Sequence, residues 1–171
     1  GLPAFFLIAD PILFKNRVPV AVIDSPAAAA DIFNDALPIL PISLTGSEHV
    51  KPGHPDAKYA AGIIESIASA TKLCLSGQAS AMVTNPISKA VLYDAGFTFP
   101  GHTEFIGHLC AEYEDRSIVT VMMLVGGGLR VALATIHVPL MKVLEHLTPD
   151  RLISSARATH TALVRAFGIP A

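Results

Sequence analysis

Short, continuous runs of apolar residues are the feature that most restricts the fold of this 171-residue chain. Residues 4–9, 18–23, 79–83 and 117–125 are almost entirely apolar, and proline, glycine or polar residues bound them. Runs of this length without alternation are typical of strands that are buried on both faces. The chain therefore predicts short internal strands, although Pro19 places the second strand at a sheet edge or at its own start.

Helical periodicity occupies much of the sequence between these runs. The clearest predicted helix covers about 55–75, where apolar side chains recur every three or four residues. A helical turn is expected over 26–33. Further helices are predicted from about Pro86 to near Gly96, from Gly101 to about Tyr113, over 139–146 and over 149–167.

Strands that alternate with helices indicate an α/β sandwich with a mixed sheet. The antiparallel part of that sheet is a hairpin, because Gly126–Gly128 separates the apolar run 117–125 from a second one at 129–136. The stretch 37–55 contains four prolines and predicts little regular structure. It is the only plausible boundary between lobes within residues 1–171.

Composition excludes several functional classes. Apolar residues make up 51% of the chain and charged residues 15%, but no run is long and apolar enough to span a membrane. A net charge of -2 with scattered cations gives no surface for nucleic acid, so the expected ligand is small. The low charge content predicts that another subunit, or parts of the protein outside this chain, cover much of the surface.

The cysteines and the chain ends add expectations about context. Cys74 and Cys110 lie in predicted helices without metal or redox spacing, which indicates buried thiols in a reducing cytoplasm. The chain starts at Gly1 rather than at methionine and ends in a helix-stopping pattern. Both ends predict an internal portion of a longer protein.

Two polar segments stand where open α/β folds place ligands, at strand ends and helix starts. In residues 84–89, a proline turn leads to Lys89, whose ammonium and neighbouring amides suit an anion. Alone, this pattern is more typical of a turn with a solvated lysine. In residues 101–104, Gly101 admits a ligand to the backbone, His102 and Thr103 offer polar groups, and Glu104 complements the helix dipole. A capped helix with an exposed histidine is the alternative.

His137 is the third candidate, at the predicted end of a buried strand and close to Pro139. This position suits a metal ligand or a proton carrier, although a catalytic zinc usually needs three protein ligands. The triplet Gly126–Gly128 is not a dinucleotide fingerprint, because strands flank it. The remaining histidines with polar surroundings are expected to be structural: His49, His54, His146 and His160.

Four motifs taken together carry a resemblance to a known family. They are Thr84-Asn-Pro-Ile-Ser-Lys89, Asp94-Ala-Gly96, Pro100-Gly-His-Thr-Glu-Phe105 and Leu129-Arg-Val-Ala-Leu-Ala-Thr-Ile-His-Val-Pro-Leu140. In order and spacing they strongly resemble the 4-hydroxythreonine-4-phosphate dehydrogenase family of pyridoxine biosynthesis. The resemblance implies a fold like that of isocitrate and isopropylmalate dehydrogenases, in a cytoplasmic homodimer about twice as long as this chain.

The resemblance also implies the reaction and the site. The family uses NAD to oxidise 4-phosphooxy-L-threonine, and decarboxylation then yields 3-amino-2-oxopropyl phosphate. By resemblance His102 and Thr103 bind the substrate, while His137 is one of three histidines that hold a divalent metal such as zinc, magnesium or cobalt. The other two histidines would lie beyond Ala171. Such a cation would stabilise the alkoxide and then the enolate.

One departure keeps alternatives open. Many family members have a histidine before the lysine of the turn motif, where this chain has Ser88. Related dehydrogenases of phosphorylated four-carbon sugar acids, erythronate or threonate phosphate, are therefore the nearest alternative. A further alternative is that the chain by itself is an inactive, dimer-forming fragment without a complete metal site.

Overall fold

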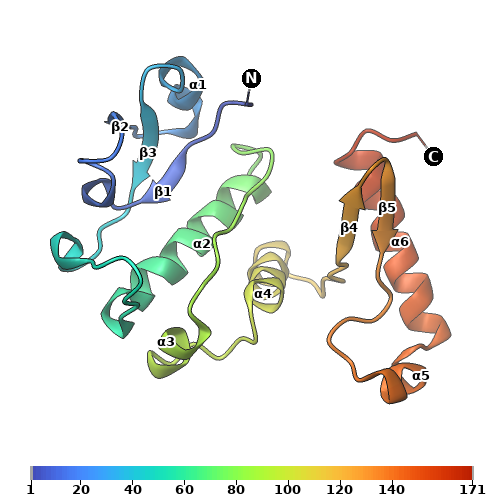
Figure 1. Ribbon diagram of the computed structural model, residues 1–171. Helices are drawn as coiled ribbons and strands as arrows, with labels where there is room; N and C mark the ends of the chain where they lie inside the picture. The colour runs from blue at the N-terminus through green and yellow to red at the C-terminus, as the bar shows by residue number, and fades with distance from the viewer. Residues whose placement is uncertain (1, 171) are drawn as a thin grey trace. The chain divides into compact units, whose positions relative to one another are not determined.

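A computed structural model describes residues 2–170, which divide into two compact units on either side of the Asp115–Arg116 bond (Figure 1). The first unit holds a small parallel sheet with helices, and the second holds a hairpin with helices. The α/β class is thus confirmed. The single mixed sheet predicted from the sequence is not formed within residues 2–170, because the parallel and antiparallel strands belong to separate sheets.

The parallel sheet consists of β1 (Leu7–Ala9), β2 (Val20–Val22) and β3 (Leu37–Pro41) in the order β1-β3-β2. Leu7 pairs with Ile39 on one side, and Val22 pairs with Ile39 on the other. Ile39 at the centre has no exposed surface. β2 lies at the edge, as Pro19 predicted.

The prediction that 37–55 has little regular structure was wrong at its start, because β3 is the central strand. In a parallel strand, alternate residues direct their N–H groups to opposite neighbours. Leu37 donates to the Pro19 carbonyl at 2.9 Å, toward β2, and Ile42 donates to Ala9 at 3.1 Å, toward β1. Pro38 therefore faces β1 before that ladder begins, and Pro41 faces β2 after that ladder ends. Neither proline removes a bond that the sheet needs.

The boundary between the two compact units, at residue 115, lies outside 37–55. A lobe boundary within 37–55 stays a prediction.

Short helical turns connect the strands. Residues Pro11–Leu13 form η1 after β1, and η2 (Pro26–Ala28) continues into α1 (Ala29–Ile32) before β3. η3 (Ser47–His49) and η4 (Ala57–Tyr59) then lead into α2. The helical turn expected over 26–33 is confirmed.

The helix predicted over 55–75 is confirmed as α2 (Ala60–Leu75), which packs on the sheet through the Ser66 hydroxyl, a donor to the Ile8 carbonyl at 2.8 Å. α3 (Lys89–Asp94) and α4 (His102–Glu114) follow along the chain. One apolar cluster joins these helices: Ala60, Ile67, Leu92, Phe97 and Phe105 are buried in it. The cluster therefore packs α2, α3 and α4 together.

The strand predicted over 79–83 is absent among the described residues. The segment after Gly77 has no regular structure until α3, and Val83 is 98% exposed. A strand needs a neighbour to accept and donate its backbone hydrogen bonds. No strand of residues 2–170 pairs with this segment, so its β-forming sequence has no ladder to join.

The second unit contains the hairpin predicted around the glycine triplet. β4 (Met123–Gly126) pairs antiparallel with β5 (Leu129–Ala132), and Gly127 and Gly128 form the turn between them. Both turn glycines have positive φ, 56° and 82°, which other residues rarely adopt. The strands are shorter than predicted, and all four residues of β5 are exposed rather than buried.

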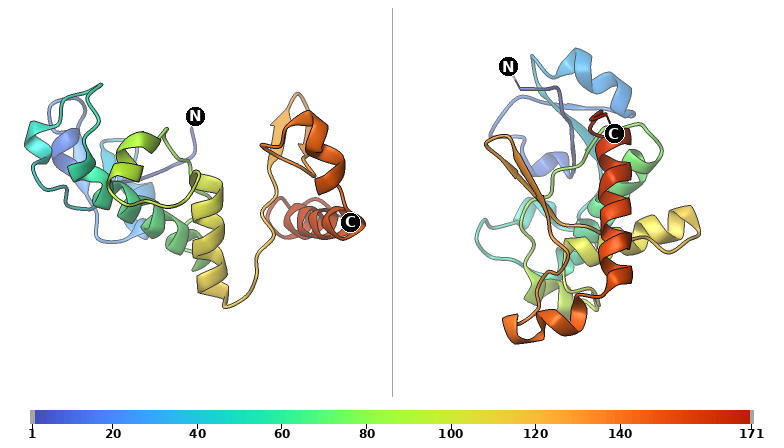
Figure 2. Two further views of the ribbon diagram at one scale, coloured as in Figure 1. Left: turned by 90° about the horizontal axis from the view of Figure 1, so that it is seen from below. Right: turned by 90° about the vertical axis from the view of Figure 1, so that its right-hand side faces the viewer.

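The last elements are η5 (Leu140–Lys142), α5 (Val143–His146) and α6 (Pro149–Arg165), close to the predicted helices. Thr148 caps α6 through its hydroxyl, which accepts from the Arg151 amide at 3.3 Å. α6 lies beside the hairpin and the segment after it, as Figure 2 shows. Among the described residues, no helix combines the length and the apolar character needed to cross a bilayer.

Candidate functional site

The start of α4 presents the polar residues of the second sequence candidate. Gly101 is the N-cap residue and offers no side chain to cap the helix, so the first amides are left for other partners. His102 and Glu104 are half-buried, and Thr103 is exposed. The helix start therefore displays an imidazole, a hydroxyl and a carboxylate on consecutive residues.

Aromatic packing holds this helix start in place. Phe105 is buried, and its ring centroid lies 5.1 Å from that of Phe97 and 5.2 Å from that of Phe99. The His108 ring lies 5.0 Å from Phe99, and His108 Nε2 is 3.4 Å from Glu112 on the same helix. Because the rings pack behind the polar residues, the site rests on core rather than on a free loop.

The structure brings Lys89, the end of the first sequence candidate, to the second one. A methyl group on the Gly101 Cα would lie 3.7 Å from Nζ of Lys89 and 3.5 Å from Oε2 of Glu104. The Tyr93 hydroxyl of α3 also reaches across to the Pro100 carbonyl, at 3.4 Å. α3 starts at Lys89 with Ser88 as its N-cap residue, later than the Pro86 start that the sequence predicted. The ammonium and the start of α4 form one cluster.

His137 belongs to the second unit. It follows β5, is exposed, and has a φ of 55°. A non-glycine residue in this left-handed region is uncommon, and such residues gather at functional sites. The backbone just before it is anchored by Arg151, whose Nε donates to the Ala134 carbonyl at 3.1 Å.

The described residues do not by themselves fit a divalent metal. Within residues 2–170, no three side chains of His, Cys, Asp or Glu come close enough to share an ion. One imidazole is too few, since catalytic metals usually take three protein ligands. His49, His54, His146 and His160 are exposed, and His49 is 3.5 Å from the Glu48 carboxylate.

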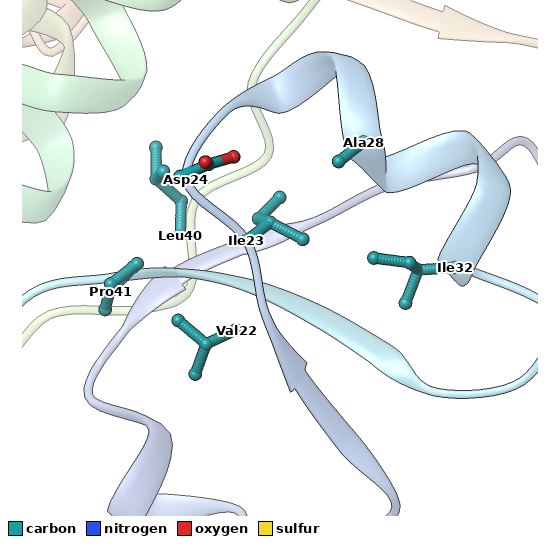
Figure 3. A pocket seen from close by; sticks show the side chains of 7 residues that line it. All are labelled: Val22, Ile23, Asp24, Ala28, Ile32, Leu40 and Pro41. Atoms are coloured by element: carbon teal, nitrogen blue, oxygen red, sulfur yellow. The ribbon is translucent and has the colours of Figure 1, made fainter.

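Sequence reasoning missed a cavity of about 530 Å³ at the carboxyl ends of β2 and β3. Figure 3 shows the apolar side chains around it, with Asp24 as the acidic group. The polar turn Asp24-Ser25-Pro26 directly after an apolar strand was the available signal. The candidate residues from 84 to 104 do not line this cavity. A second cavity, of about 360 Å³, lies in the second unit between residues 119–136 and α6, with Arg151 and Ser154 in its wall.

An acidic group and two thiols of the first unit have shifted pKa values. Burial acts to raise the pKa of Asp10, but hydrogen bonds from the Leu44 and Ile12 amides, both at 3.0 Å, and from Ser47 outweigh it and leave that pKa lowered. Burial raises the pKa of Cys74 and of Cys110. Both cysteines are free thiols that stay protonated at neutral pH, which argues against a nucleophilic role.

The fold and the site define an α/β protein whose polar candidate residues begin a helix that packs on an aromatic cluster. Residues 3–171 match the model of one family, described as pyridoxal phosphate biosynthetic protein PdxA. The chain belongs to that family. Gly127 and Gly128 join two antiparallel strands, whereas the glycines of a dinucleotide fingerprint join a strand to a helix.

Known relatives and solved structures agree with this assignment. A 4-hydroxythreonine-4-phosphate dehydrogenase from Maricaulis maris is 48% identical over 79% of this chain and 40% of its own length. One from Methylorubrum extorquens is 42% identical over 99% of this chain and 50% of its own length. The crystal structure of the enzyme so named from Klebsiella pneumoniae superposes with a TM-score of 0.77 and 26% identity, over 92% of this chain and 48% of that one. The chain thus spans about half the length of the relatives it matches.

Proposed function

We propose that the complete protein oxidises 4-phosphooxy-L-threonine with NAD, in the pathway that supplies pyridoxal phosphate. The observation that carries this proposal is the match along residues 3–171 to relatives named for this substrate, together with the clustering of Lys89, His102 and Thr103 at one helix start. Decarboxylation of the resulting β-keto acid would give 3-amino-2-oxopropyl phosphate.

His102 and Thr103 would bind and orient the substrate. His102 is half-buried on the first turn of α4, and its imidazole can direct one nitrogen to a substrate oxygen. The exposed Thr103 hydroxyl can donate to an anionic oxygen and accept from a hydroxyl. Held by both groups, the substrate would have a single orientation of its C3–H bond relative to the nicotinamide.

NAD would accept the hydride, and the described residues show no dinucleotide site of the usual glycine-rich kind. We therefore assign no NAD-binding residue. A divalent metal would polarise the substrate oxygen, with His137 as one of its ligands and the remaining ligands outside the described residues. Its exposed side chain and left-handed backbone support that role, and its single imidazole cannot complete a site.

A homodimer is the partner proposal that the surface supports. Large apolar side chains of the hairpin are exposed, including Val125 at 61% and Leu129 at 65%. Such residues are normally covered, either by a second subunit or by the rest of a polypeptide. The inactive, dimer-forming fragment remains the alternative for this chain alone.

The free thiols of Cys74 and Cys110 support a location in the reducing cytoplasm.

A second candidate reaction is the oxidation of erythronate or threonate phosphate. The observation in its favour is Ser88, which makes no side-chain cap on α3 and stands beside Lys89 where many family members have histidine. The changed residue borders the proposed substrate site, so it bears on which phosphorylated acid is accepted.

The test is NADH formation by the full-length protein with the three phosphorylated acids, measured by near-ultraviolet absorbance with and without added divalent metal. We expect the highest kcat/KM with 4-phosphooxy-L-threonine. A higher value for erythronate or threonate phosphate would assign the protein to the second reaction. No NADH from any of them, with a folded protein and each metal, would contradict both.

A further inference from the structure

The cavity of the second unit has one cationic side chain in its wall. This cavity measures about 360 Å³ and lies between residues 119–136 and the side of α6. Arg151, in the first turn of α6, lines it and forms no ion pair within residues 2–170. Asp150, its neighbour in the sequence, is exposed and does not line the cavity. An unpaired positive charge in a cavity wall favours an anionic ligand.

Two hydrogen bonds restrict the orientation of Arg151. Its Nε donates to the Ala134 carbonyl at 3.1 Å, and its backbone amide donates to the Thr148 hydroxyl at 3.3 Å. Within the described residues, its two terminal nitrogens make no hydrogen bond. A planar guanidinium that is fixed through Nε still presents these nitrogens as a fork, which matches the two oxygens of a carboxylate. The side chain of Arg151, and not the capped helix end, is therefore the group available to an anion.

The same wall contains hydroxyl groups from two segments of the chain. Thr120 lines the cavity from the segment before β4, and Ser155 lines it from α6, one turn after Arg151. In the part of the chain that the structure describes, neither hydroxyl has a hydrogen-bond partner. The Ser154 hydroxyl, in contrast, donates to the Asp150 carbonyl at 2.7 Å. Thr120 and Ser155 can thus donate to the oxygens of a ligand.

The remaining wall is apolar and restricts the class of anion. Leu133, Ala134 and Ile136 line the cavity and are half-buried, and Val119 and Met122 also line it. The hydrocarbon part of a ligand would be removed from water against these side chains. Because no second cation lines the cavity, the second charge of a phosphate dianion would have no partner there. The charge and the wall together favour a monocarboxylate with a short hydrocarbon chain.

We infer that this cavity binds a small monocarboxylate. Its oxygens bind Arg151 and the hydroxyls of Thr120 and Ser155, and its hydrocarbon chain packs against Leu133 and Ile136. The inference goes beyond the proposed reaction, because none of the residues assigned to that reaction lines the cavity.

The test titrates hexanoate into the full-length protein and measures Kd by ligand-observed nuclear magnetic resonance. We expect saturable binding, with a Kd that rises about two- to fourfold for each methylene removed between hexanoate and acetate, because each methylene contacts the apolar wall. Hexan-1-ol has the same chain without the charge and should bind about 10-fold more weakly. Inorganic phosphate at the same concentration should not displace hexanoate.

Two variants locate the binding within the protein. Arg151→Gln removes the charge but keeps a donor for the Ala134 carbonyl, so the Kd of hexanoate should rise about 10-fold or more and that of hexan-1-ol less than about twofold. Ser155→Leu leaves Arg151 in place and puts a larger side chain into the cavity, so both ligands should bind more weakly. The matched control is Arg157→Gln, an exposed arginine of α6 that does not line the cavity and should change neither Kd.

Several results would overturn the inference. A full-length protein that binds no hexanoate would show that the complete protein has no such site. Hexan-1-ol bound as tightly as hexanoate, or an equal effect of Arg151→Gln and Arg157→Gln, would show that the charge of Arg151 does not recognise the ligand. Displacement by phosphate at equal concentration would exclude the monocarboxylate class. Circular dichroism confirms that each variant is folded, and Ser155→Leu tests the cavity even where Arg151→Gln does not fold.

Discussion

The start of α4 and the neighbourhood of His137 differ in how much of their surroundings is buried within the described residues. Behind His102 and Thr103 lie the buried rings of Phe97 and Phe105, so the polar groups stand on a packed core. Around His137, by contrast, the preceding strand β5 is exposed along its whole length. The comparison teaches that the proposed substrate-binding residues rest on a packed apolar cluster, whereas the proposed metal ligand His137 follows an exposed strand.

The largest expected effect tests the packed region. Phe105→Ala should lower the free energy of unfolding of the first unit by about 3–5 kcal/mol, because it removes a buried ring and leaves a cavity among its neighbours. Chemical denaturation followed by circular dichroism measures the loss. The matched change in the other region, Leu124→Ala, removes a side chain that is 54% exposed and should cost within about 0.5 kcal/mol. Equal costs would erase the contrast between the two regions.

The next effect tests the exposed region by function. His137→Ala in the full-length protein should lower metal-dependent NADH formation about 100-fold or more, because even outer-shell partners of metal ligands are worth 10- to 100-fold. Initial rates and bound metal content are the measurements. The control is His146→Ala, an exposed histidine of α5. Retained metal and turnover in His137→Ala would remove His137 from the site.

Sequence patterns predicted some elements of the fold and missed others, for physical reasons. α2 and the glycine hairpin follow from local periodicity and turn chemistry, which act over a few residues. β3 was missed because its prolines fall where the ladder needs no N–H, a fact of register rather than of composition. The segment 79–83 has strand-forming residues but no pairing strand in the described part. Propensity alone does not supply a neighbour.

The candidate site shows the same limit. The sequence pointed to His102 and Thr103 through a glycine before a helix, and it treated Lys89 as part of a separate turn. The approach of Lys89 to Gly101 depends on how α3 and α4 share one apolar cluster, which no local pattern encodes. The position of His137 relative to His102 and Thr103 stays a prediction, because these residues lie in different units.

A smaller effect comes from a polar group inside the first unit. Asp10 is 5% exposed, and its carboxylate accepts from the Ile12 and Leu44 amides. Its folded-state pKa is lowered, so its ionised form contributes stability that is present above the unfolded pKa and is lost as pH falls through the folded pKa. Asp10→Ala should therefore cost ~1–2 kcal/mol at neutral pH and less as pH falls through the lowered folded-state pKa of Asp10.

Unfolding measured across pH, with Asp35→Ala as an exposed control, checks this sign. A cost for Asp10→Ala that stays constant from neutral to acidic pH would show that the carboxylate charge contributes nothing. The second unit has no buried carboxylate among its described residues, so the same titration there should show only the shallow response of surface charges.

The smallest expected effect returns to the packed region and tests binding alone. Thr103→Val keeps the shape of an exposed side chain in the first turn of α4 but removes its hydroxyl, so folding should change little. One hydrogen bond to substrate is worth about 1 kcal/mol net, which predicts a ~5-fold rise in KM with a smaller change in kcat. The control, Thr45→Val, changes an exposed threonine outside the site. An unchanged KM would contradict the binding role of Thr103, because its hydroxyl would then contact water and not the substrate. His102 would be the one remaining substrate-binding candidate of that pair.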